Sequence, residues 1–329
     1  MTGFAYVSPP WLPGGNAQTI WAALVAGRGA PPAYRRERWS TPDGDFIDVA
    51  FHESGAGAAP GRPLLVLFHG LEGSSQSHYA RAFAAFAQAR GMDYAVPHFR
   101  GCSGEMNLAP RAYHSGDYEE VGWILQRLRE RHAAAGGGPL LAVGVSLGGN
   151  ALLRWAEEAG ESAARTVAAV AAVSAPVDLA AGGAAIGRGF NRLTYTRMFL
   201  QTMKPKALAK WTQHPGLFDR DALLDARDLY AFDNIFTAPL HGFRNTDDYW
   251  SRGSAKPYLA AIRVPALVLN ARNDPFVPAA SLPDATQVGR HVTLWQPAHG
   301  GHVGFASGGP PGHVAAMPQA VGGWLSQAL

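Results

Sequence analysis

The sequence has very little cysteine and no long uninterrupted apolar run. Its single cysteine, Cys102, excludes an intrachain disulfide framework and removes any cysteine cluster for zinc. No stretch reaches the roughly 18 consecutive apolar residues that a membrane-spanning helix needs. The N-terminus has no basic start, and Pro and Gly interrupt its apolar stretch, unlike a signal peptide. We therefore expect a cytoplasmic protein without a transmembrane segment, because its cysteine usage is compatible with a reducing compartment.

Charged residues are also scarce. They make up 16% of the 329 residues, whereas hydrophobic residues make up 47%, and the formal net charge is only +3. No dense Lys/Arg run with interleaved aromatic residues occurs, so we expect no nucleic-acid partner. A chain of this length and composition can bury a large core as one domain with a substantial insertion.

The pattern of apolar residues predicts an α/β fold. Short apolar runs alternate with segments of helical periodicity, which is typical of βαβ units and a mostly parallel sheet with helices on both faces. The expected strands are residues 46–52, 64–68, 94–96, 140–143, 167–173, 266–269 and 292–295. The expected helices are residues 77–90, 117–132, 149–159 and 313–328.

The alternation stops between Asp178 and Pro257. We interpret residues 178–257 as a helical cap inserted into a single domain that spans residues 1–329, over the carboxyl edge of the sheet, where open α/β sheets bind ligands. Its aromatic residues could line an acyl-chain pocket or form the core of the cap itself. They are Phe232, Phe236, Phe243, Tyr249 and Trp250. Near the N-terminus, the apolar residues that we expect in an arm packed on the body are Phe4, Trp11, Leu12, Ile20, Trp21 and Leu24.

The most informative motif is Gly-Val-Ser-Leu-Gly at residues 144–148. In a chain with 39 glycines the pattern alone is weak, but an apolar run precedes it and a helical stretch follows it. A sharp turn between a strand and a helix places Ser146 Oγ at the N-terminus of the helix, where N–H groups and the helix dipole favour negative charge. The motif therefore predicts Ser146 as a nucleophile.

A serine nucleophile needs a base, and that base needs an acid to orient it. Asp274 follows the strand 266–269, and His302 lies in the glycine-rich loop after the strand 292–295, which matches one known order of such residues. The predicted roles are His302 as general base and then acid, and Asp274 as the residue that orients its imidazole.

Other residues compete for these roles. Asp178 could supply the acid or cap the first cap helix. The alternative histidines are His299, His291 and His313. Donors for the tetrahedral oxyanion are expected from the backbone N–H groups of Leu71 and Leu147. His69 is interpreted as a side chain that organises the loop through hydrogen bonds.

Six motifs together resemble the YheT-type branch of the α/β-hydrolase superfamily, which is similar to the ABHD1 and ABHD3 type of serine hydrolases. They are HGLEGSS, RGCSGEMN with a following YHSG, GVSLGGN, TAPLHGF, NARNDPF and GGHVGF. The likeness extends from LPGGNAQTIW to the C-terminal helix. It implies an α/β-hydrolase fold and serine esterase activity on carboxylic esters, including short-chain esters, acylglycerols or phospholipid acyl groups. It also matches Ser146, Asp274 and His302 to the family's triad positions.

The resemblance also places the loop Phe99–Gly104 near the site. Arg100 or Arg111 could bind an anionic substrate group, although an internal salt bridge is the more common use of such an arginine. Cys102 is interpreted as a packed thiol.

These observations predict a hydrolase of carboxylic esters, of carboxylesterase or acylglycerol lipase type, that forms an acyl-enzyme on Ser146. No metal or cofactor is expected. The expected partner is a small-molecule ester or lipid, and transient contact with a membrane surface fits that substrate class. Two alternatives stay open: an acyltransferase that uses the same triad, and a non-catalytic ligand-binding protein with the same fold.

Overall fold

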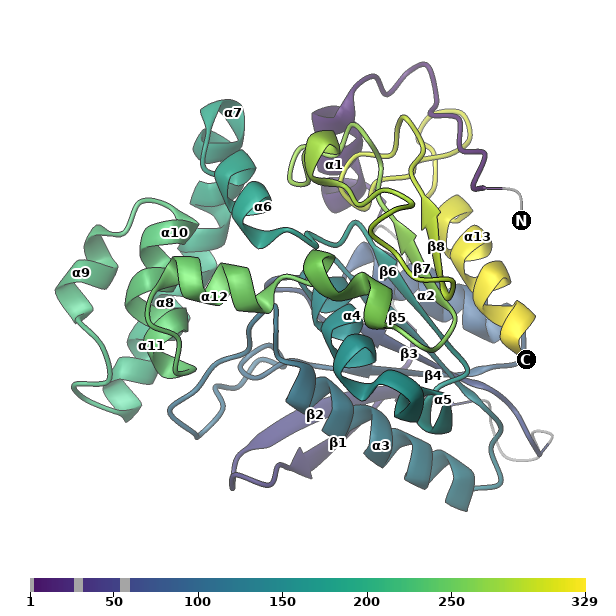
Figure 1. Ribbon diagram of the computed structural model, residues 1–329, viewed down its shortest axis with the longest axis horizontal. Helices are drawn as coiled ribbons and strands as arrows, with labels where there is room; N and C mark the ends of the chain where they lie inside the picture. Colours follow the sequence, from purple (N-terminus) through teal and green to yellow (C-terminus); the bar gives the residue numbers. More distant parts are fainter. Residues whose placement is uncertain (1–2, 27–31, 54–59) are drawn as a thin grey trace.

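The computed structural model describes residues 3–26, 32–53 and 60–329. Its strands form one eight-stranded sheet in the order β1-β2-β4-β3-β5-β6-β7-β8 (Figure 1). The strands are β1 (Arg35–Ser40), β2 (Phe46–His52), β3 (Leu64–Phe68), β4 (Asp93–Pro97), β5 (Leu140–Val145), β6 (Ala169–Val173), β7 (Ala266–Leu269) and β8 (Val292–Trp295). Strand β2 pairs antiparallel with both of its neighbours, and all the other pairs are parallel. The predicted mostly parallel sheet is therefore confirmed.

Helices cover both faces of the sheet. Helices α2 (His78–Ala89) and α13 (Ala316–Leu325) pack on one face, where Phe83 and Met317 lie in the same buried cluster as the strands. Helices α3 (Tyr118–Ala134) and α4 (Leu147–Ala159) pack on the other. The two apolar layers bury both faces of the central strands, which explains why these strands are almost continuously apolar in sequence.

The pattern of apolar residues in the sequence did not predict strand β1. Its residues, RRERWS, leave four of six positions exposed, and only Trp39 is buried. An edge strand of this kind carries charges instead of an apolar run, so apolar periodicity does not detect it.

Between β6 and β7 the described chain is helical. We call residues 179–253 the cap helices; in Figure 1 they extend to the left of the sheet. They comprise α6 (Leu179–Ile186), α7 (Gly189–Asn191), the π-helical turn η2 (Arg192–Thr196), α8 (Arg197–Gln213), α9 (Arg220–Asp225), α10 (Leu229–Phe232), the π-helical turn η3 (Asp233–Thr237), α11 (Ala238–Leu240) and α12 (Thr246–Gly253). Short helical turns complete the rest of the chain: η1 (Gly160–Ser162), α5 (Ala163–Thr166), η4 (Lys256–Ala261), η5 (Ala279–Ser281) and η6 (Ser326–Ala328).

The N-terminal arm contains helix α1 (Gly15–Leu24) and packs on the body, as expected for most of its apolar residues. Leu12 and Trp21 are buried against Ala306 and Val314, far along the chain. The expectation was wrong for Leu24, which is 70% exposed because it lies at the free end of the helix. Within the described ranges, no helix is long and apolar enough to cross a membrane.

Candidate active site

Ser146 lies in a strained turn between β5 and α4. Its φ of 52° and ψ of −120° place a non-glycine residue in a backbone region that is rarely populated. The Ser146 N–H donates to Val173 O at 2.8 Å, which ties the turn to the neighbouring strand. The side chain is half-buried and lines a cavity above the carboxyl ends of the strands.

The glycines of the motif are required by close packing around this turn. A Cβ at Gly144 would lie 2.3 Å from Gly148 O, and a Cβ at Gly148 would lie 2.5 Å from the backbone oxygens of Phe68 and His69. A side chain at Gly144 would push apart the two ends of the turn, and one at Gly148 would push the turn away from the end of β3. The glycines therefore allow Ser146 to stand at the sheet edge beside the loop that follows β3.

The structure brings Asp274 and His302 to the same edge. His302 Nε2 lies 2.9 Å from Ser146 Oγ, and His302 Nδ1 lies 2.9 Å from Asp274 Oδ2. Because the carboxylate only accepts hydrogen bonds, Nδ1 carries the proton and Nε2 can accept the proton of the serine hydroxyl. Asp274 is buried, and its Oδ1 accepts from the Phe276 N–H at 2.7 Å, which fixes the carboxylate.

The competing residues lie elsewhere or have other partners. Asp178 caps α6, since its Oδ1 accepts from the Ala181 N–H at 3.0 Å. His299 is exposed and contacts Asn273 at 3.4 Å. His291 accepts from the neighbouring Arg290, and His313 forms hydrogen bonds with Ser307. None of these contacts involves Ser146.

The loop after β3 lies beside Ser146, and its backbone N–H groups differ in their hydrogen-bond partners. The Gly70 N–H donates to Tyr79 Oη and the Glu72 N–H donates to Tyr113 Oη, both at 2.9 Å. Within the described chain, no protein group accepts from the N–H of Leu71 or Leu147, and both residues line the cavity. These two N–H groups are thus available to a ligand oxygen beside Ser146.

His69 organises this loop, as interpreted from the sequence. Its Nδ1–H donates to Gly70 O at 2.8 Å, and its Nε2 accepts from the Phe99 N–H at 3.0 Å. Burial lowers the pKa of His69 to about 3, so the ring stays neutral and keeps this donor and acceptor arrangement.

A cap residue also holds the loop. Lys206 of α8 places its Nζ 2.9 Å from Glu72 Oε2, and Tyr113 Oη donates to Glu72 Oε1 at 2.9 Å. Glu72 has a φ of 56°, so these contacts stabilise a strained residue directly after Leu71. Lys206 Nζ also lies 3.7 Å from Cys102 Sγ. Burial raises the pKa of Cys102 to about 11, consistent with a packed thiol.

Sequence reasoning missed the part of α1 that braces the His302 loop. The His302 N–H donates to Thr19 Oγ1 at 2.8 Å, and the Gly300 N–H donates to Gln18 Oε1 at 2.9 Å. Asn273 joins both sides: its Nδ2 donates to Gln18 Oε1 at 3.1 Å and its Oδ1 accepts from the Gly301 N–H at 3.0 Å. The polar pair Gln18-Thr19 in a mostly apolar helix was the signal that the sequence offered.

The cavity beside Ser146 extends under the cap helices. Its apolar lining comes mainly from the cap and from the loop after β7: Leu179, Ile186, Phe199, Met203, Phe236 and Phe276. Of the five cap aromatics considered in the sequence, Phe243 does not line this cavity, whereas the other four do. Those four also belong to the buried clusters of the cap, so they serve both as pocket lining and as core.

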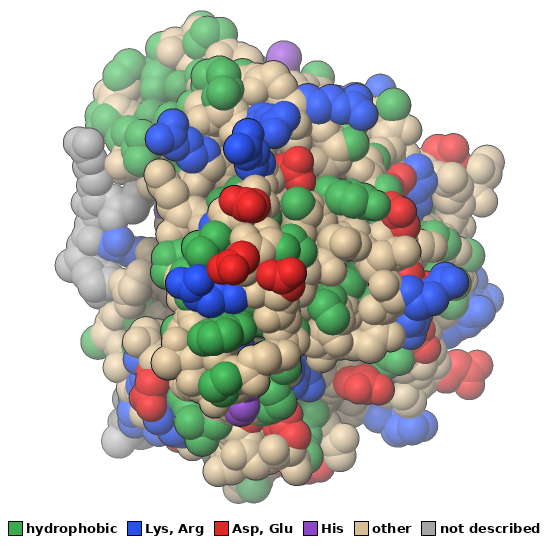
Figure 2. Space-filling view, turned by 90° about the vertical axis from the view of Figure 1, so that its left-hand side faces the viewer, with side chains coloured by type: hydrophobic (Ala, Val, Ile, Leu, Met, Phe, Trp, Pro, Cys, Tyr) green, Lys and Arg blue, Asp and Glu red, His purple; other side chains and the backbone are tan. Residues whose placement is uncertain are grey.

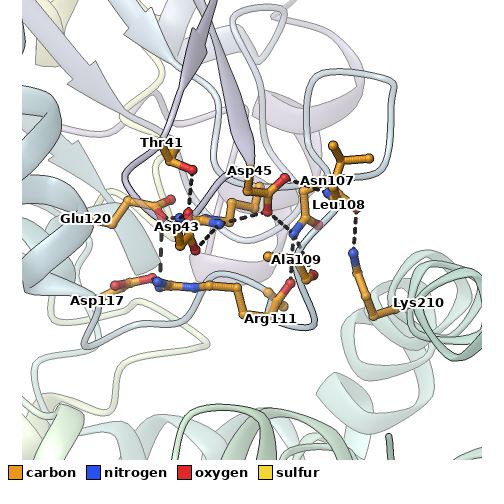
Figure 3. A network of polar contacts seen from close by, with 12 residues as sticks. Thr41, Asp43, Asp45, Asn107, Leu108, Ala109, Arg111, Asp117, Glu120 and Lys210 are labelled. Carbon is orange, nitrogen blue, oxygen red and sulfur yellow. Dashed lines mark hydrogen bonds and ion pairs between the residues drawn. The ribbon is translucent and has the colours of Figure 1, made fainter. Parts of the chain in front are cut away.

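Arg100 and Arg111 form internal salt bridges. Arg100 contacts Asp43 and Asp45 at 2.8 Å and Glu120 at 2.5 Å, and Arg111 contacts Asp117 at 2.6 Å. Figure 3 shows this network, which Asn107 and Lys210 extend toward the cap. Arg100 lines the cavity, but its guanidinium is already surrounded by carboxylates. Among the described residues, no group of three or more His, Cys, Asp or Glu side chains could hold a metal ion.

The sheet order and the placement of Ser146, Asp274 and His302 at the ends of β5, β7 and β8 define the class of α/β-hydrolases. A model of the alpha/beta hydrolase fold family matches residues 63–308. YheT of Escherichia coli strain K12, named as a candidate esterase, is 40% identical over 274 residues, which are 83% of this chain and 78% of that protein.

The chain is also similar to a more distant relative and to a solved structure. Phospholipase ABHD3 of Mus musculus is 29% identical over 312 residues, which are 92% of this chain and 74% of that protein. The solved structure of the Pyrococcus furiosus esterase Pf2001 is similar with a TM-score of 0.54 at 15% identity, over 90% of each chain, and supports the fold. The chain belongs to the YheT and ABHD type of the α/β-hydrolase family.

Proposed function

We propose that the chain hydrolyses carboxylic esters through an acyl-enzyme on Ser146. Hydrolysis of carboxylic esters follows from family membership. The chemical route is supported above all by the chain of contacts from Asp274 through His302 to Ser146 Oγ, with both links at 2.9 Å. Such a chain turns a weakly nucleophilic hydroxyl into a nucleophile.

The proposed reaction has two halves. Ser146 Oγ attacks the ester carbonyl carbon while His302 Nε2 takes its proton, and the resulting oxyanion accepts from the N–H groups of Leu71 and Leu147. The C–O bond to the alcohol breaks, and His302 returns the proton to the leaving oxygen. Water then attacks the acyl carbon while His302 takes its proton. The bond between the acyl carbon and Ser146 Oγ breaks, and His302 returns the proton to Oγ, which releases the acid and restores the Ser146 hydroxyl.

We propose that the cap, residues 178–257 of the single domain, receives the apolar part of the substrate. The apolar lining by Phe199, Met203 and Phe236 supports an acyl chain or another apolar ester group in this position. The substrate class is then a small-molecule ester or a lipid ester, of the carboxylesterase or acylglycerol lipase type.

The test combines covalent labelling with turnover. Wild-type protein, Ser146→Ala and His302→Ala are treated with a fluorophosphonate, the labelled peptide is mapped by mass spectrometry, and hydrolysis of p-nitrophenyl esters of increasing chain length is measured. We expect labelling on Ser146 that requires His302, and a loss in kcat of roughly 10⁶-fold in either variant.

Two substitutions serve as matched controls. Ser251 is exposed on α12, and the His291 ring accepts a hydrogen bond from its neighbour Arg290, away from Ser146, so Ser251→Ala and His291→Ala are expected to keep wild-type turnover. Folded wild-type protein that neither labels nor turns over any ester would refute the proposal and favour a ligand-binding role. Labelling at a serine other than Ser146 would refute the assigned nucleophile.

A further inference from the structure

The cap carries a surface with an unusual charge distribution. Between Asp178 and Asp219 the sequence has six Lys and Arg residues and no Asp or Glu. Three of the six, Arg188, Arg192 and Arg197, are exposed on the segment from α7 to the start of α8. None of these three has a carboxylate partner in the described parts of the chain, whereas Arg100 and Arg111 near the active site each form salt bridges with carboxylates.

Large apolar side chains are exposed on the same segment. Phe190 is 53% exposed, Leu193 is 75% exposed and Met198 is 50% exposed. Arg192 and Leu193 begin the π-helical turn η2, and Arg197 and Met198 begin the next helix, α8. Leu193, Arg192 and Arg197 also line one surface groove together with Lys204 and Arg227. We call the exposed apolar and basic residues of 188–198, together with the groove residues Lys204 and Arg227, the basic cap face.

The position of the basic cap face links it to the active-site cavity. Ile186, which precedes this segment, and Phe199, which lies within it, line the cavity that contains Ser146. In Figure 2, which shows the side of the molecule with the cap helices, Lys and Arg side chains lie next to hydrophobic ones toward the top, and most Asp and Glu side chains lie lower. One helical segment therefore separates the outer surface from the cavity.

We propose that the basic cap face docks on anionic lipid surfaces, with Leu193, Phe190 and Met198 inserted among the acyl chains and the arginines bound to lipid phosphates. Exposed apolar residues surrounded by arginines are the composition of helices that lie in a membrane interface. A second copy of this chain is a poorer occupant, because a two-fold contact would place the same unpaired arginines opposite each other. The docking does not depend on the proposed ester hydrolysis.

The test measures vesicle binding with the Ser146→Ala variant, so that hydrolysis plays no part. The protein is incubated with vesicles of phosphatidylcholine alone or of phosphatidylcholine with phosphatidylglycerol. The bound protein is then measured after flotation of the vesicles. We expect binding to the anionic vesicles only. Arg192→Gln with Arg197→Gln should weaken it about 30-fold, since each cation near an anionic bilayer contributes roughly fivefold. Leu193→Ser should weaken it about tenfold through lost apolar insertion.

Control substitutions lie on other parts of the molecule. Leu329 is 52% exposed at the C-terminus, on the opposite side from the cap in Figure 1, and Arg165 is exposed on α5. Leu329→Ser and Arg165→Gln are expected to bind as tightly as the parent. Absence of vesicle binding, equal binding to neutral vesicles, or binding unaffected by the cap substitutions would overturn the proposal. A dimer in sedimentation velocity that Leu193→Ser abolishes would assign the face to a second copy and overturn it as well.

Discussion

Single residues outside the proposed triad hold its geometry, and Thr19 is the clearest case. Thr19 Oγ1 accepts from the His302 N–H at 2.8 Å and donates to Gly15 O at 2.7 Å, so it joins α1 to the loop that carries the imidazole. Small displacements of a catalytic group are costly in rate. We expect Thr19→Val to lower kcat about tenfold with little change in KM, whereas Thr19→Ser, which keeps the hydroxyl, should retain wild-type turnover.

Steady-state kinetics on a soluble ester, with circular dichroism to verify folding, would decide this point. A folded Thr19→Val protein with unchanged kcat would show that the contact has no role in positioning His302. A rise confined to KM would place its effect on substrate binding instead.

Asp233 is a second residue with a specific expectation, because it is a carboxylate in an apolar cavity. It accepts from Thr237 Oγ1 at 2.6 Å and from Trp250 Nε1 at 2.9 Å, and burial raises its pKa to about 6. A carboxyl group whose pKa is higher in the folded state than in the unfolded state stabilises the fold while it is protonated, and this contribution is complete below the unfolded-state pKa. That contribution is lost as pH rises through about 6.

The Asp233→Asn variant has no proton to lose, so its free energy of unfolding should not show this decline. Relative to wild type, we expect the variant to gain up to about 3 kcal/mol between pH 4 and pH 7, at about 1.4 kcal/mol per pKa unit. Urea unfolding across this range measures the difference. Parallel pH profiles for the two proteins would contradict the raised pKa.

At the scale of elements, α8 and the loop after β3 act together. Lys206 on α8 is the cation that holds Glu72, and Glu72 follows directly after the proposed oxyanion donor Leu71. Lys206→Met would leave the largely buried Glu72 carboxylate without its cation, so the loop should shift. We expect kcat to fall about tenfold, and Lys206→Arg to restore most of it because the charge returns.

Separate measurement of kcat and KM distinguishes a positioning role of Lys206 from direct substrate binding. If Lys206→Met raised KM and left kcat at the wild-type value, Lys206 would contact the substrate and would not order the loop. Equal activity of Lys206→Met and wild type would show that the contact between Lys206 and Glu72 does not order the loop after β3.

The same elements show what the sequence could and could not predict. The central strands were predictable because burial on both faces makes them apolar. The strand–turn–helix that carries Ser146 was predictable because close backbone approaches require glycine at positions 144 and 148. The edge strand β1 was not predictable, because its residues are mostly charged. The two π-helical turns were also missed, because one inserted residue alters the helical period without changing composition. The roles of Thr19 and Gln18 depend on contacts more than 250 residues apart in the chain.

At the scale of the whole molecule, buried charge joins the cap to the sheet. Arg100 forms salt bridges with Asp43 and Asp45, which precede β2, and with Glu120 on α3. Asp45 accepts from Asn107 Nδ2 at 2.7 Å, and Asn107 O in turn accepts from Lys210 Nζ of α8 at 2.5 Å. The helix that holds Glu72 through Lys206 is therefore anchored a turn later to the hairpin at the far edge of the sheet. This anchoring fixes the cap at its inner side and leaves the basic cap face directed outward.

If the basic cap face docks on lipid, an ester can reach the cavity either from solution or from a vesicle surface. The dependence of the hydrolysis rate on salt concentration distinguishes the two routes. A soluble short-chain ester diffuses to the cavity and carries no charge, so its hydrolysis should be insensitive to ionic strength. An ester presented in anionic vesicles depends on the docking of Arg188, Arg192 and Arg197, whose attraction is screened as the Debye length falls from about 10 Å at 0.1 M salt to about 3 Å at 1 M. We expect the vesicle reaction to slow at least tenfold over this range while the soluble reaction changes less than twofold. Parallel assays of the wild-type protein at both salt concentrations measure this difference. The two assays share the chemistry at Ser146 and differ only in how the ester reaches it. An equal loss of both activities would therefore indicate that salt acts on the active site itself and would contradict the docking.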